Sequence, residues 1–196
     1  MERPSLLLLI SGPAGSGKTT LCDRLLEEFS PGLQRVVTAT TRQPREGEQD
    51  GTDYHFLDES EFLDKVSKHE FYEYAQVHSG YYGTLKSSIQ DKLASHIDLL
   101  LNIDVQGAQT FRRLAREDSQ LAGQLRTLFV LPSSIDQIRQ RLVRRGQDTP
   151  EEIERRLLTA NTEMEHKDKF DYILNSSSKG EDYANIRDFY LQAIGQ

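Results

Sequence analysis

The segment LLLLISGPAGSGKT, residues 6–19, constrains the fold of this chain more than any other. Residues 6–10 are all apolar, as in a strand buried on both faces of a parallel sheet. Four residues then match the phosphate-loop pattern G-x-x-x-x-G-K-[S/T]: Gly12, Gly17, Lys18 and Thr19. Apolar residues recur at helical spacing from Leu21 onward. A strand, a glycine-rich loop and a helix in this order predict a site for the phosphates of a nucleoside triphosphate.

Each residue type in this loop has a chemical role. Glycines let the backbone turn so that successive N–H groups point at phosphate oxygens, and the following helix adds its N-terminal partial charge. Lys18 can reach the β- and γ-phosphates, and the Thr19 hydroxyl can ligate Mg²⁺, which we expect as the cofactor. We expect the triphosphate to be bound by Gly12, Pro13, Ala14, Gly15, Ser16, Gly17, Lys18, Thr19 and Thr20.

Length and charge restrict the class of protein. A chain of 196 residues predicts one domain with small inserted subdomains. The net charge of −7 argues against a protein that coats nucleic acid. No apolar stretch approaches the roughly 20 residues that span a bilayer. Cys22 is the only cysteine, which fits a reducing compartment. We therefore expect a cytoplasmic protein, monomeric or homo-oligomeric, with small-molecule partners and no nucleic acid or membrane.

Strands and helices alternate along the chain, which is typical of a doubly wound α/β fold with a parallel sheet. Apolar runs at 98–104 and 125–131 predict two further buried strands. The other elements expected in this core are helices over 106–118 and 183–194 and a strand over 170–174. Polar residues end the strand at 98–104, where ligands of such sheets gather.

The region between residues 38 and 87 predicts a small α+β insertion. We expect a strand over 34–41, a polar loop over 42–54, a strand over 54–57, a helix over 58–68, a strand over 71–77 and a turn over 79–84, followed by a helix to about residue 95. Asp58 and Glu61 are spaced as a capping box at the start of the helix.

Two helices with several arginines are expected over 134–145 and 150–167, separated at Gly146. Thr149 and Glu152 form a second capping-box pattern. The arginines are Arg139, Arg141, Arg144, Arg145, Arg155 and Arg156. Their pattern fits either a solvated helix face or a mobile lid that carries positive charge onto a triphosphate and excludes water.

Candidate residues for a second substrate lie in the insertion. Arg42 and Arg45, with Tyr54 and Tyr82, are suitable for holding a phosphate monoester, although a solvated loop gives the same pattern. Two carboxylates on strand-like segments, Glu73 and Asp104, can accept the adjacent N1–H and N2 amino donors of guanine, and the hydroxyls of Thr38 and Thr84 can donate to its O6. Adenine presents the opposite pattern, so such a site discriminates.

Five segments in order make the chain resemble the guanylate kinase family. They are SGPAGSGKTTL at 11–21, TATTRQPREGEQDGTDYHF at 38–56, FYEYAQVHSGYYGT at 71–84, NIDVQGA at 102–108 and RLVRRGQDTPEEIERRL at 141–157. The resemblance implies a P-loop NTPase-type core (1–37, 88–136 and 158–196), a GMP-binding insertion (38–87) and a helical lid (about 137–157). It implies ATP-dependent phosphorylation of GMP and dGMP to the diphosphates, with Mg²⁺.

The resemblance also implies roles for individual residues. Thr38, Glu73, Thr84 and Asp104 read the guanine. The GMP phosphate is held by Arg42, Arg45, Tyr54 and Tyr82. Lys18, Arg42, Arg145 and Arg156 act in catalysis, and Asn175 lies near the ATP base. The chain departs from the family pattern at Thr38, where Ser is usual, at Asn102, where an acidic residue is frequent, and at Ser176–Ser178, which replace an acidic pair.

Two other functions fit a chain of this build. Guanylate kinase-like domains of scaffold proteins bind peptides, but they typically lack an intact phosphate loop and lid arginines, and both are present here. A kinase for another phosphorylated small molecule is the second alternative. The pair Glu73 and Asp104 argues against it, because a non-purine substrate would not need that pair.

Overall fold

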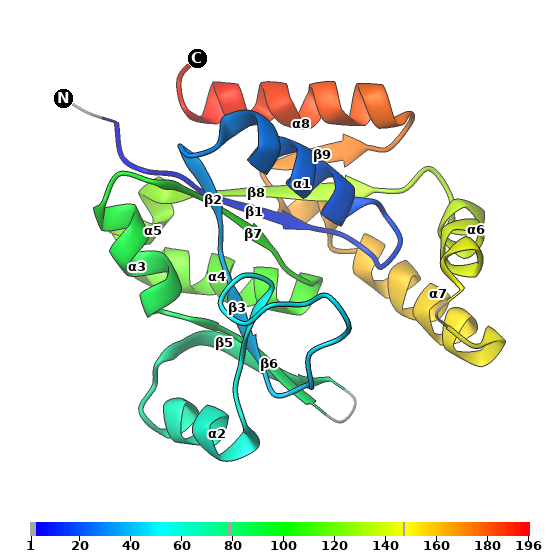
Figure 1. The fold of residues 1–196 in the computed structure, drawn as a ribbon. Coiled ribbons are helices and arrows are strands. Elements are labelled where there is room, and N and C mark those ends of the chain that lie inside the picture. The colour runs from blue at the N-terminus through cyan, green and yellow to red at the C-terminus, as the bar shows by residue number, and fades with distance from the viewer. Residues whose placement is uncertain (1–2, 78–79, 147) are drawn as a thin grey trace.

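The structure, a computed structural model, describes residues 3–77, 80–146 and 148–196 (Figure 1). Its larger sheet has five strands in the order β2-β7-β1-β8-β9, and every neighbouring pair is parallel. The strands are β1 (Leu7–Ser11), β2 (Leu33–Arg35), β7 (Asp98–Asn102), β8 (Leu125–Leu131) and β9 (Tyr172–Asn175). The phosphate-loop strand β1 is therefore the central strand, as its continuous apolar run predicts.

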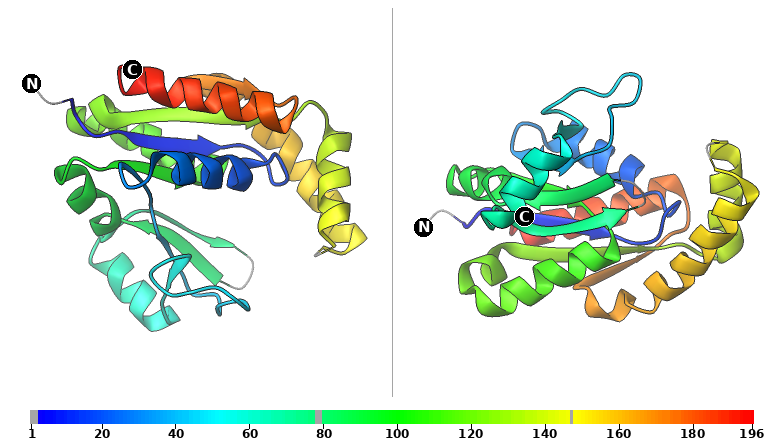
Figure 2. Two further views of the ribbon diagram at one scale, coloured as in Figure 1. Left: turned by 45° about the horizontal axis from the view of Figure 1, so that its top comes forward. Right: turned by 90° about the horizontal axis from the view of Figure 1, so that it is seen from below.

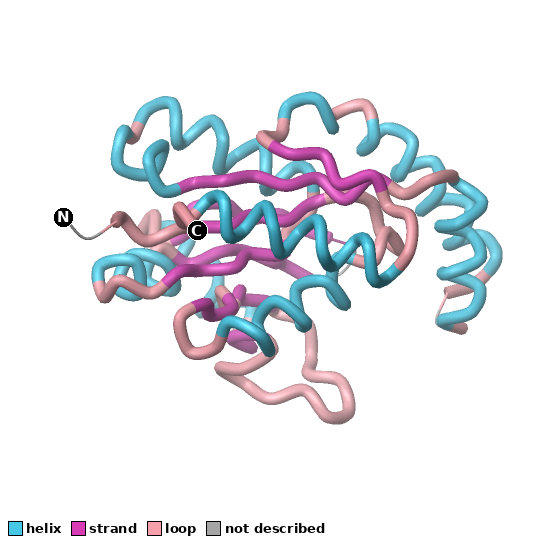
Figure 3. Tube along the Cα trace, turned by 90° about the horizontal axis from the view of Figure 1, so that it is seen from above, coloured by secondary structure: helices cyan, strands magenta, loops and turns pink. Residues whose placement is uncertain are grey.

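Helices cover both faces of this sheet, so the doubly wound α/β expectation is confirmed. One face carries α1 (Lys18–Phe29) and α8 (Lys179–Ala193), and the other α3 (Ser87–Ala94), α4 (Val105–Glu117) and α5 (Ser119–Gln124). Seen from above, helices run alongside the core strands on both sides of the sheet (Figure 3). In the part of the chain that the structure describes, no helix combines the length and apolar character needed to cross a membrane.

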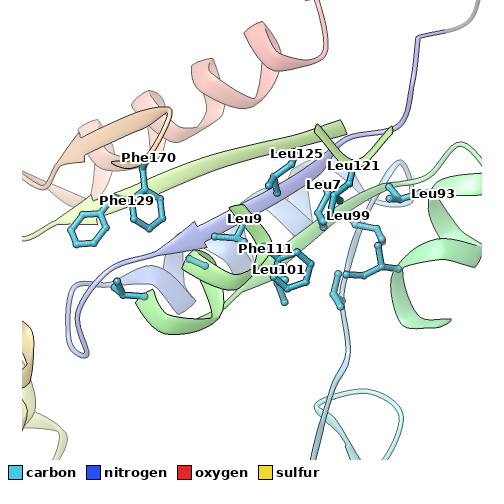
Figure 4. Close-up of a cluster of buried hydrophobic side chains, with 14 residues drawn as sticks. Leu7, Leu9, Leu93, Leu99, Leu101, Phe111, Leu121, Leu125, Phe129 and Phe170 are labelled. Atoms are coloured by element: carbon cyan, nitrogen blue, oxygen red, sulfur yellow. The ribbon is translucent and has the colours of Figure 1, made fainter. Parts of the chain in front are cut away.

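The apolar side chains of β1 alternate between two cores. Leu7 and Leu9 pack with the α3, α4 and α5 side, where Phe111 and Phe129 fill the space (Figure 4). Leu8 and Ile10 point to the opposite face, and Leu8 packs there in the same cluster as Cys22 of α1. Because every residue of β1 is buried, this strand cannot shift by one residue without exchanging both sets of contacts. The fixed register of β1 therefore also fixes where the phosphate loop begins.

A second, four-stranded sheet stands beside the core, in the lower part of Figure 1. Its order is β4-β3-β6-β5, with strands β3 (Thr38–Thr40), β4 (Tyr54–Phe56), β5 (Phe71–Val77) and β6 (Gly80–Leu85). The helix α2 (Glu59–Ser67) covers it, with Phe62 stacked on Phe71 at a centroid distance of 4.5 Å. The predicted capping box of Asp58 and Glu61 is present at the start of α2.

A helical pair, α6 (Ile135–Arg145) and α7 (Pro150–Met164), extends from one end of the core (Figure 2). Gly146 ends α6 in the left-handed conformation, at φ 65°. The pair has a small core of its own, in which Ile138 and Leu142 pack against Ile153 and Leu157. The predicted capping box of Thr149 and Glu152 starts α7, and a 3₁₀ turn, η1 (Lys167–Lys169), follows it.

Two predicted elements of the insertion are wrong. Residues 34–41 do not form one strand, because the chain leaves the core sheet after β2 and enters the second sheet at β3. Local β propensity does not say with which sheet a residue pairs. The predicted turn at 79–84 is instead strand β6 from Gly80 onward. There Gly83 allows close packing, since a Cβ at this position would lie 2.8 Å from the Phe71 ring.

Two helix boundaries also differ from the sequence-based expectation. α5 was not predicted, because its six residues carry too short a pattern. α8 begins at Lys179, four residues before the predicted start at 183, since the Ser178 hydroxyl caps it by accepting from the backbone N–H of Glu181.

A buried carboxylate ties the amino end of the chain to the core. Asp98, at the start of β7, is 1 % exposed. It accepts hydrogen bonds from both terminal nitrogens of Arg3 (2.9 and 2.6 Å), the Leu6 N–H (2.8 Å) and the Tyr190 hydroxyl (2.8 Å). Burial, together with the neighbouring carboxylate, raises the pKa of Tyr190. The clamp joins β1, β7 and α8.

We expect Asp98→Ala to lower the free energy of unfolding by about 3 kcal/mol, because the Leu6 N–H, the buried Tyr190 hydroxyl and the exposed Arg3 guanidinium lose their acceptor. Urea denaturation followed by circular dichroism measures the loss. Asp91→Ala, an exposed site on α3, is the matched control and should change stability by less than about 0.5 kcal/mol. Equal stabilities of the two variants would contradict the assigned role of Asp98.

Candidate functional site

The phosphate loop joins β1 to α1, and its glycines adopt conformations that other residues avoid. Gly12, Gly15 and Gly17 have φ of 137°, 80° and 103°. A Cβ on Gly12 would also lie 2.5 Å from the Val130 carbonyl oxygen of the neighbouring strand. The loop therefore needs glycine at this position both for its φ and for close packing against β8.

Lys18 lies at the first position of α1 and folds back over the loop. Its ammonium donates to the carbonyl oxygens of Gly12 (2.5 Å) and Pro13 (2.9 Å). Burial lowers the pKa of Lys18, while the charges of Glu163 and Asp104 act in the opposite direction. An ammonium held by two neutral carbonyls is available to exchange them for charged phosphate oxygens.

The remaining loop residues line the same turn. The Ser16 hydroxyl oxygen is buried and has no hydrogen-bond partner among the described residues. Thr19 and Thr20 are exposed in the first turn of α1. Pro13 and Ala14 follow Gly12 in the loop between β1 and α1. Arg141 of α6 donates to the carbonyl oxygens of Gly15 (3.1 Å) and Ser16 (2.8 Å), so the helical pair contacts the loop directly.

A polar pocket of about 260 Å³ lies between the second sheet and the carboxyl end of β7. Its lining includes six of the residues that the sequence predicted for the second substrate: Thr38, Tyr54, Glu73, Tyr82, Thr84 and Asp104. Asn102 at the end of β7 also lines it. These residues come from five strands and from the loop before α4, so only the tertiary fold brings them together.

Glu73 is the acidic group most affected by this pocket. The Thr84 hydroxyl donates to its Oε1 at 2.6 Å, across the β5–β6 pairing. Burial raises the pKa of Glu73 to about 7, and the nearby negative charge of Asp104 adds to the effect. Asp104 itself caps α4, since its Oδ1 accepts from the Gly107 N–H at 2.8 Å. The pocket thus holds two carboxylates, and neither forms an ion pair within the part of the chain that the structure describes.

Arg42 lies beside the pocket in a bidentate ion pair that the sequence reasoning missed. Its two terminal nitrogens donate to Glu48 at 2.8 and 2.9 Å, and its guanidinium lies 5.3 Å from the centroid of Tyr54. The Arg45 backbone N–H donates to the same carboxylate at 2.7 Å. These contacts hold the pKa of Glu48 at about 2. The sequence signal for this ion pair was an arginine and a glutamate six residues apart, Arg42 and Glu48, in a loop rich in turn residues.

The rings of Tyr54 and Tyr82 lie with centroids 6.2 Å apart beside this guanidinium. The Tyr82 hydroxyl also contacts Arg42, and this contact contributes to a raised pKa of the guanidinium. The Arg45 side chain is exposed and does not line the pocket. Three of the four predicted phosphate-binding side chains are therefore adjacent in this structure.

The other predicted residues lie farther from the pocket. Arg156 of α7 pairs with Asp148 at 2.9 Å and so faces the break between the lid helices. Arg145 is the last residue of α6, and its side chain lies outside the part that the structure describes. Asn175 ends β9, paired with Leu131, and is exposed. The hydroxyl of Ser176 beside it donates to Asp182 at 2.7 Å.

Glu163, in the last turn of α7, is a second residue that the sequence reasoning missed. Burial raises its pKa to about 7, Lys18 opposes that shift, and Asp104 reinforces it. The Lys18 ammonium therefore lies within the field of two carboxylates. A regular helix pattern conceals such a residue, because which helix face meets the phosphate loop is a tertiary property.

The oxygens near the loop suit a hard cation. Among the described residues no group of three or more His, Cys, Asp or Glu side chains is arranged to hold a metal. Mg²⁺ usually keeps several waters and takes one or two protein oxygens plus substrate phosphates. The exposed Thr19 hydroxyl, with Asp104 and Glu163 acting on neighbouring Lys18, fits that mode of binding.

A phosphate loop that adjoins a second polar pocket, with an arginine-bearing helical pair over the loop, defines a P-loop kinase with two substrate sites. The family model described as guanylate kinase matches residues 4–193 of the chain. The chain belongs to the guanylate kinase family.

Named relatives agree with the family match. The chain is 44 % identical to the guanylate kinase of Dechloromonas aromatica (strain RCB), an alignment that covers 86 % of this chain and 79 % of the relative. It is 42 % identical to that of Wolbachia sp. subsp. Brugia malayi (strain TRS), over 89 % and 86 %. The crystal structure of guanylate kinase from Anaplasma phagocytophilum matches with a TM-score of 0.77 and 28 % identity, over 100 % of this chain and 89 % of that one.

Glu73 makes stability depend on pH. Its pKa in the native protein, about 7, is above the ordinary carboxyl value of 4.5, so the native state binds the extra proton between these values. The stability that this proton confers is present below pH 4.5 and is lost as pH rises through 7. As pH rises from 4.5 to 7, we expect the free energy of unfolding of wild type to fall by up to about 3 kcal/mol relative to that of Glu73→Gln.

Urea denaturation of both proteins without nucleotide, between about pH 5 and pH 8, measures this difference. A difference between Glu73→Gln and wild type that stays constant with pH would contradict the burial-driven shift.

Proposed function

We propose that the protein transfers the γ-phosphoryl group of ATP to GMP, and also to dGMP, forming ADP and the diphosphate. The observation that carries this proposal is the pocket beside the phosphate loop, in which Glu73 and Thr84 are hydrogen-bonded at 2.6 Å and which Asp104 also lines. Guanine offers two adjacent donors, N1–H and the N2 amino group, to a carboxylate. We propose the cytoplasm as the location of the protein, because ATP and GMP are small soluble molecules.

The base is read by complementary hydrogen bonding. Glu73 accepts from N1–H and N2, and Asp104 accepts from the second N2 hydrogen through the oxygen that does not cap α4. The Thr38 hydroxyl donates to O6, and the Thr84 hydroxyl joins it by turning away from Glu73, to which it donates in the free protein. Adenine has an acceptor at N1 and a donor at position 6, so it would leave buried polar groups unpaired. Thr38 keeps the hydroxyl that this role requires.

The GMP phosphate is held by Arg42 and Arg45 with the Tyr54 and Tyr82 hydroxyls. Arg42 already presents its fork to a carboxylate, Glu48, and lies over the Tyr54 ring, so it is held in place before substrate binds. Arg45 is brought close when the insertion (38–87) closes on the core. The ion pair with Glu48 opens when Arg42 turns its guanidinium to the phosphate, while its contact with the Tyr54 ring limits the ordering cost of binding.

Transfer of the phosphoryl group requires positioning and charge neutralisation. Lys18 leaves the Gly12 and Pro13 carbonyls for the β- and γ-phosphates. The Thr19 hydroxyl would help to hold Mg²⁺, which would supply neutralisation of the charge that develops on the transferred group. Arg145 and Arg156 contribute further positive charge once the lid (about 137–157) closes and water is excluded. No general base is needed, because the attacking GMP phosphate oxygen is already ionised.

The donor base lies at the end of β9. The Asn175 side chain is exposed there and is free to bond the adenine edge. The hydroxyls of Ser176 and Ser177 are already bonded to Asp182 and Glu181, so they orient the loop before α8. We propose Asn175 as the adenine contact and the serines as its support.

A coupled assay for ADP formation, with ATP and Mg²⁺ and with GMP, dGMP, AMP, CMP or UMP as acceptor, tests the proposed function. We expect turnover with GMP and dGMP only. Lys18→Ala, purified in the same way, controls for a contaminating kinase and should lower turnover by orders of magnitude. Turnover with none of the five would contradict the proposal, and calorimetric titration with GMP would then separate a binding module from a kinase for another phosphorylated molecule.

We expect GMP affinity to depend on pH through Glu73, because only the ionised carboxylate accepts both guanine donors. With a pKa of about 7 in the free protein, binding should be about tenfold weaker at pH 6 than at pH 8. Glu73→Gln should bind GMP more weakly than wild type and lose this component of the pH dependence, while ATP affinity stays unchanged.

Isothermal titration calorimetry at several pH values checks this. Both proteins share the titration of the GMP phosphate, so the ratio of their dissociation constants isolates Glu73. A ratio independent of pH, or an equal loss of ATP and GMP affinity, would refute the base-reading role.

A further inference from the structure

The carboxylate of Glu163, on the lid helix α7, is close enough to the phosphate loop for the charge of Lys18 to act on it. It is half-buried in the last turn of α7, and among the described residues it makes no hydrogen bond and no ion pair. Two charges act on it, the Lys18 ammonium from α1 and the Asp104 carboxylate from the loop before α4. A carboxylate removed from water without a partner is costly unless a ligand completes its surroundings.

The helix that carries Glu163 connects the lid to the core. Arg156, Ala160 and Glu163 are spaced i, i+4 and i+7, so they lie on one face of α7 along about 10 Å of helix. Ala160 is buried against α6 in the lid cluster, whereas Met164, next to Glu163, packs against the core cluster beneath the sheet. The orange end of α7 reaches the core in Figure 1. Arg156 therefore belongs to the lid and Glu163 to the fixed part of the site.

A bound triphosphate increases the electrostatic repulsion on the Glu163 carboxylate. In the free protein the cation whose charge acts on Glu163 is Lys18. Phosphate oxygens brought to Lys18 would add negative charge next to Glu163 and Asp104. A second cation in this space removes the conflict, and the exposed Thr19 hydroxyl, next to Lys18 in α1, is one oxygen ligand for it. Two carboxylates without a third ligand do not form a metal site by themselves, in agreement with the absence of such a group among the described residues.

We propose that Glu163 is a positioning residue for phosphoryl transfer: together with Asp104 it accepts hydrogen bonds from the waters of the Mg²⁺ that accompanies ATP, and it favours the Lys18 position that meets the phosphates. The inference rests on the proposed function. One face of α7 then carries two functional residues: Arg156, which moves with the lid, and Glu163, which stays next to the phosphate loop. Outer-sphere partners of this kind orient a metal without ligating it.

The test is calorimetric titration of ATP into wild type and Glu163→Gln, with excess Mg²⁺ and with EDTA. In EDTA the variant should bind ATP as tightly as wild type or a few-fold more tightly, because a repelling charge is gone. Mg²⁺ should strengthen ATP binding to the variant about 10–100-fold less than to wild type, the range found for outer-sphere metal partners. At saturating substrates we expect kcat to fall by a similar factor while the GMP dissociation constant stays the same.

Glu165→Gln is the matched control, since it removes the same charge from the exposed end of the same helix. It should behave as wild type, and Glu163→Asp should recover part of the Mg²⁺ effect. Thermal unfolding of all variants confirms that each is folded. An equal Mg²⁺ effect in wild type, Glu163→Gln and Glu165→Gln would overturn the role of Glu163. No Mg²⁺ effect in wild type would instead overturn the proposed metal dependence of ATP binding.

Discussion

The hydrogen-bonded pairing of β1 with β7 and β8 is the constraint on which the rest of this structure depends. Because β1 is parallel to both neighbours and buried on both faces, its register is determined twice, by the ladder and by two cores. The phosphate loop follows directly from its carboxyl end. Asp104 follows the carboxyl end of β7, so the loop lysine and the pocket carboxylate reach the same edge of the sheet.

Several charged groups in the free site are buried or paired with groups other than a substrate, and bound substrates would supply their partners. Carboxylates at Glu73 and Glu163 both have pKa values raised to about 7 by burial, whereas the Lys18 ammonium has a pKa lowered by burial. Arg42 is paired with Glu48 instead of with a substrate phosphate. Each of these groups carries a desolvation cost or a provisional partner, and perturbed groups of this kind gather at functional sites.

Part of the fold could be predicted because its signals are local. The loop glycines, the capping boxes at Asp58 and Thr149 and the αL stop at Gly146 each depend on a few neighbouring residues. The predictions failed where pairing partners decide. A β-branched run was divided between two sheets at Val36 and Val37, and Gly83 indicated a turn although it lies in a strand that packs on Phe71.

For the site, the sequence by itself determined which chemistry is available. A loop motif with its strand and helix, and a set of carboxylates, hydroxyls and arginines in recognisable segments, are readable because residue type and spacing carry their meaning. The tertiary structure alone decided which of these groups share a space: Glu73 with Thr84 and Asp104, Arg42 with Glu48, and Glu163 with Lys18. The physical reason is that burial and charge proximity arise between elements distant in the chain, and they set the pKa values and free partners that no local pattern records.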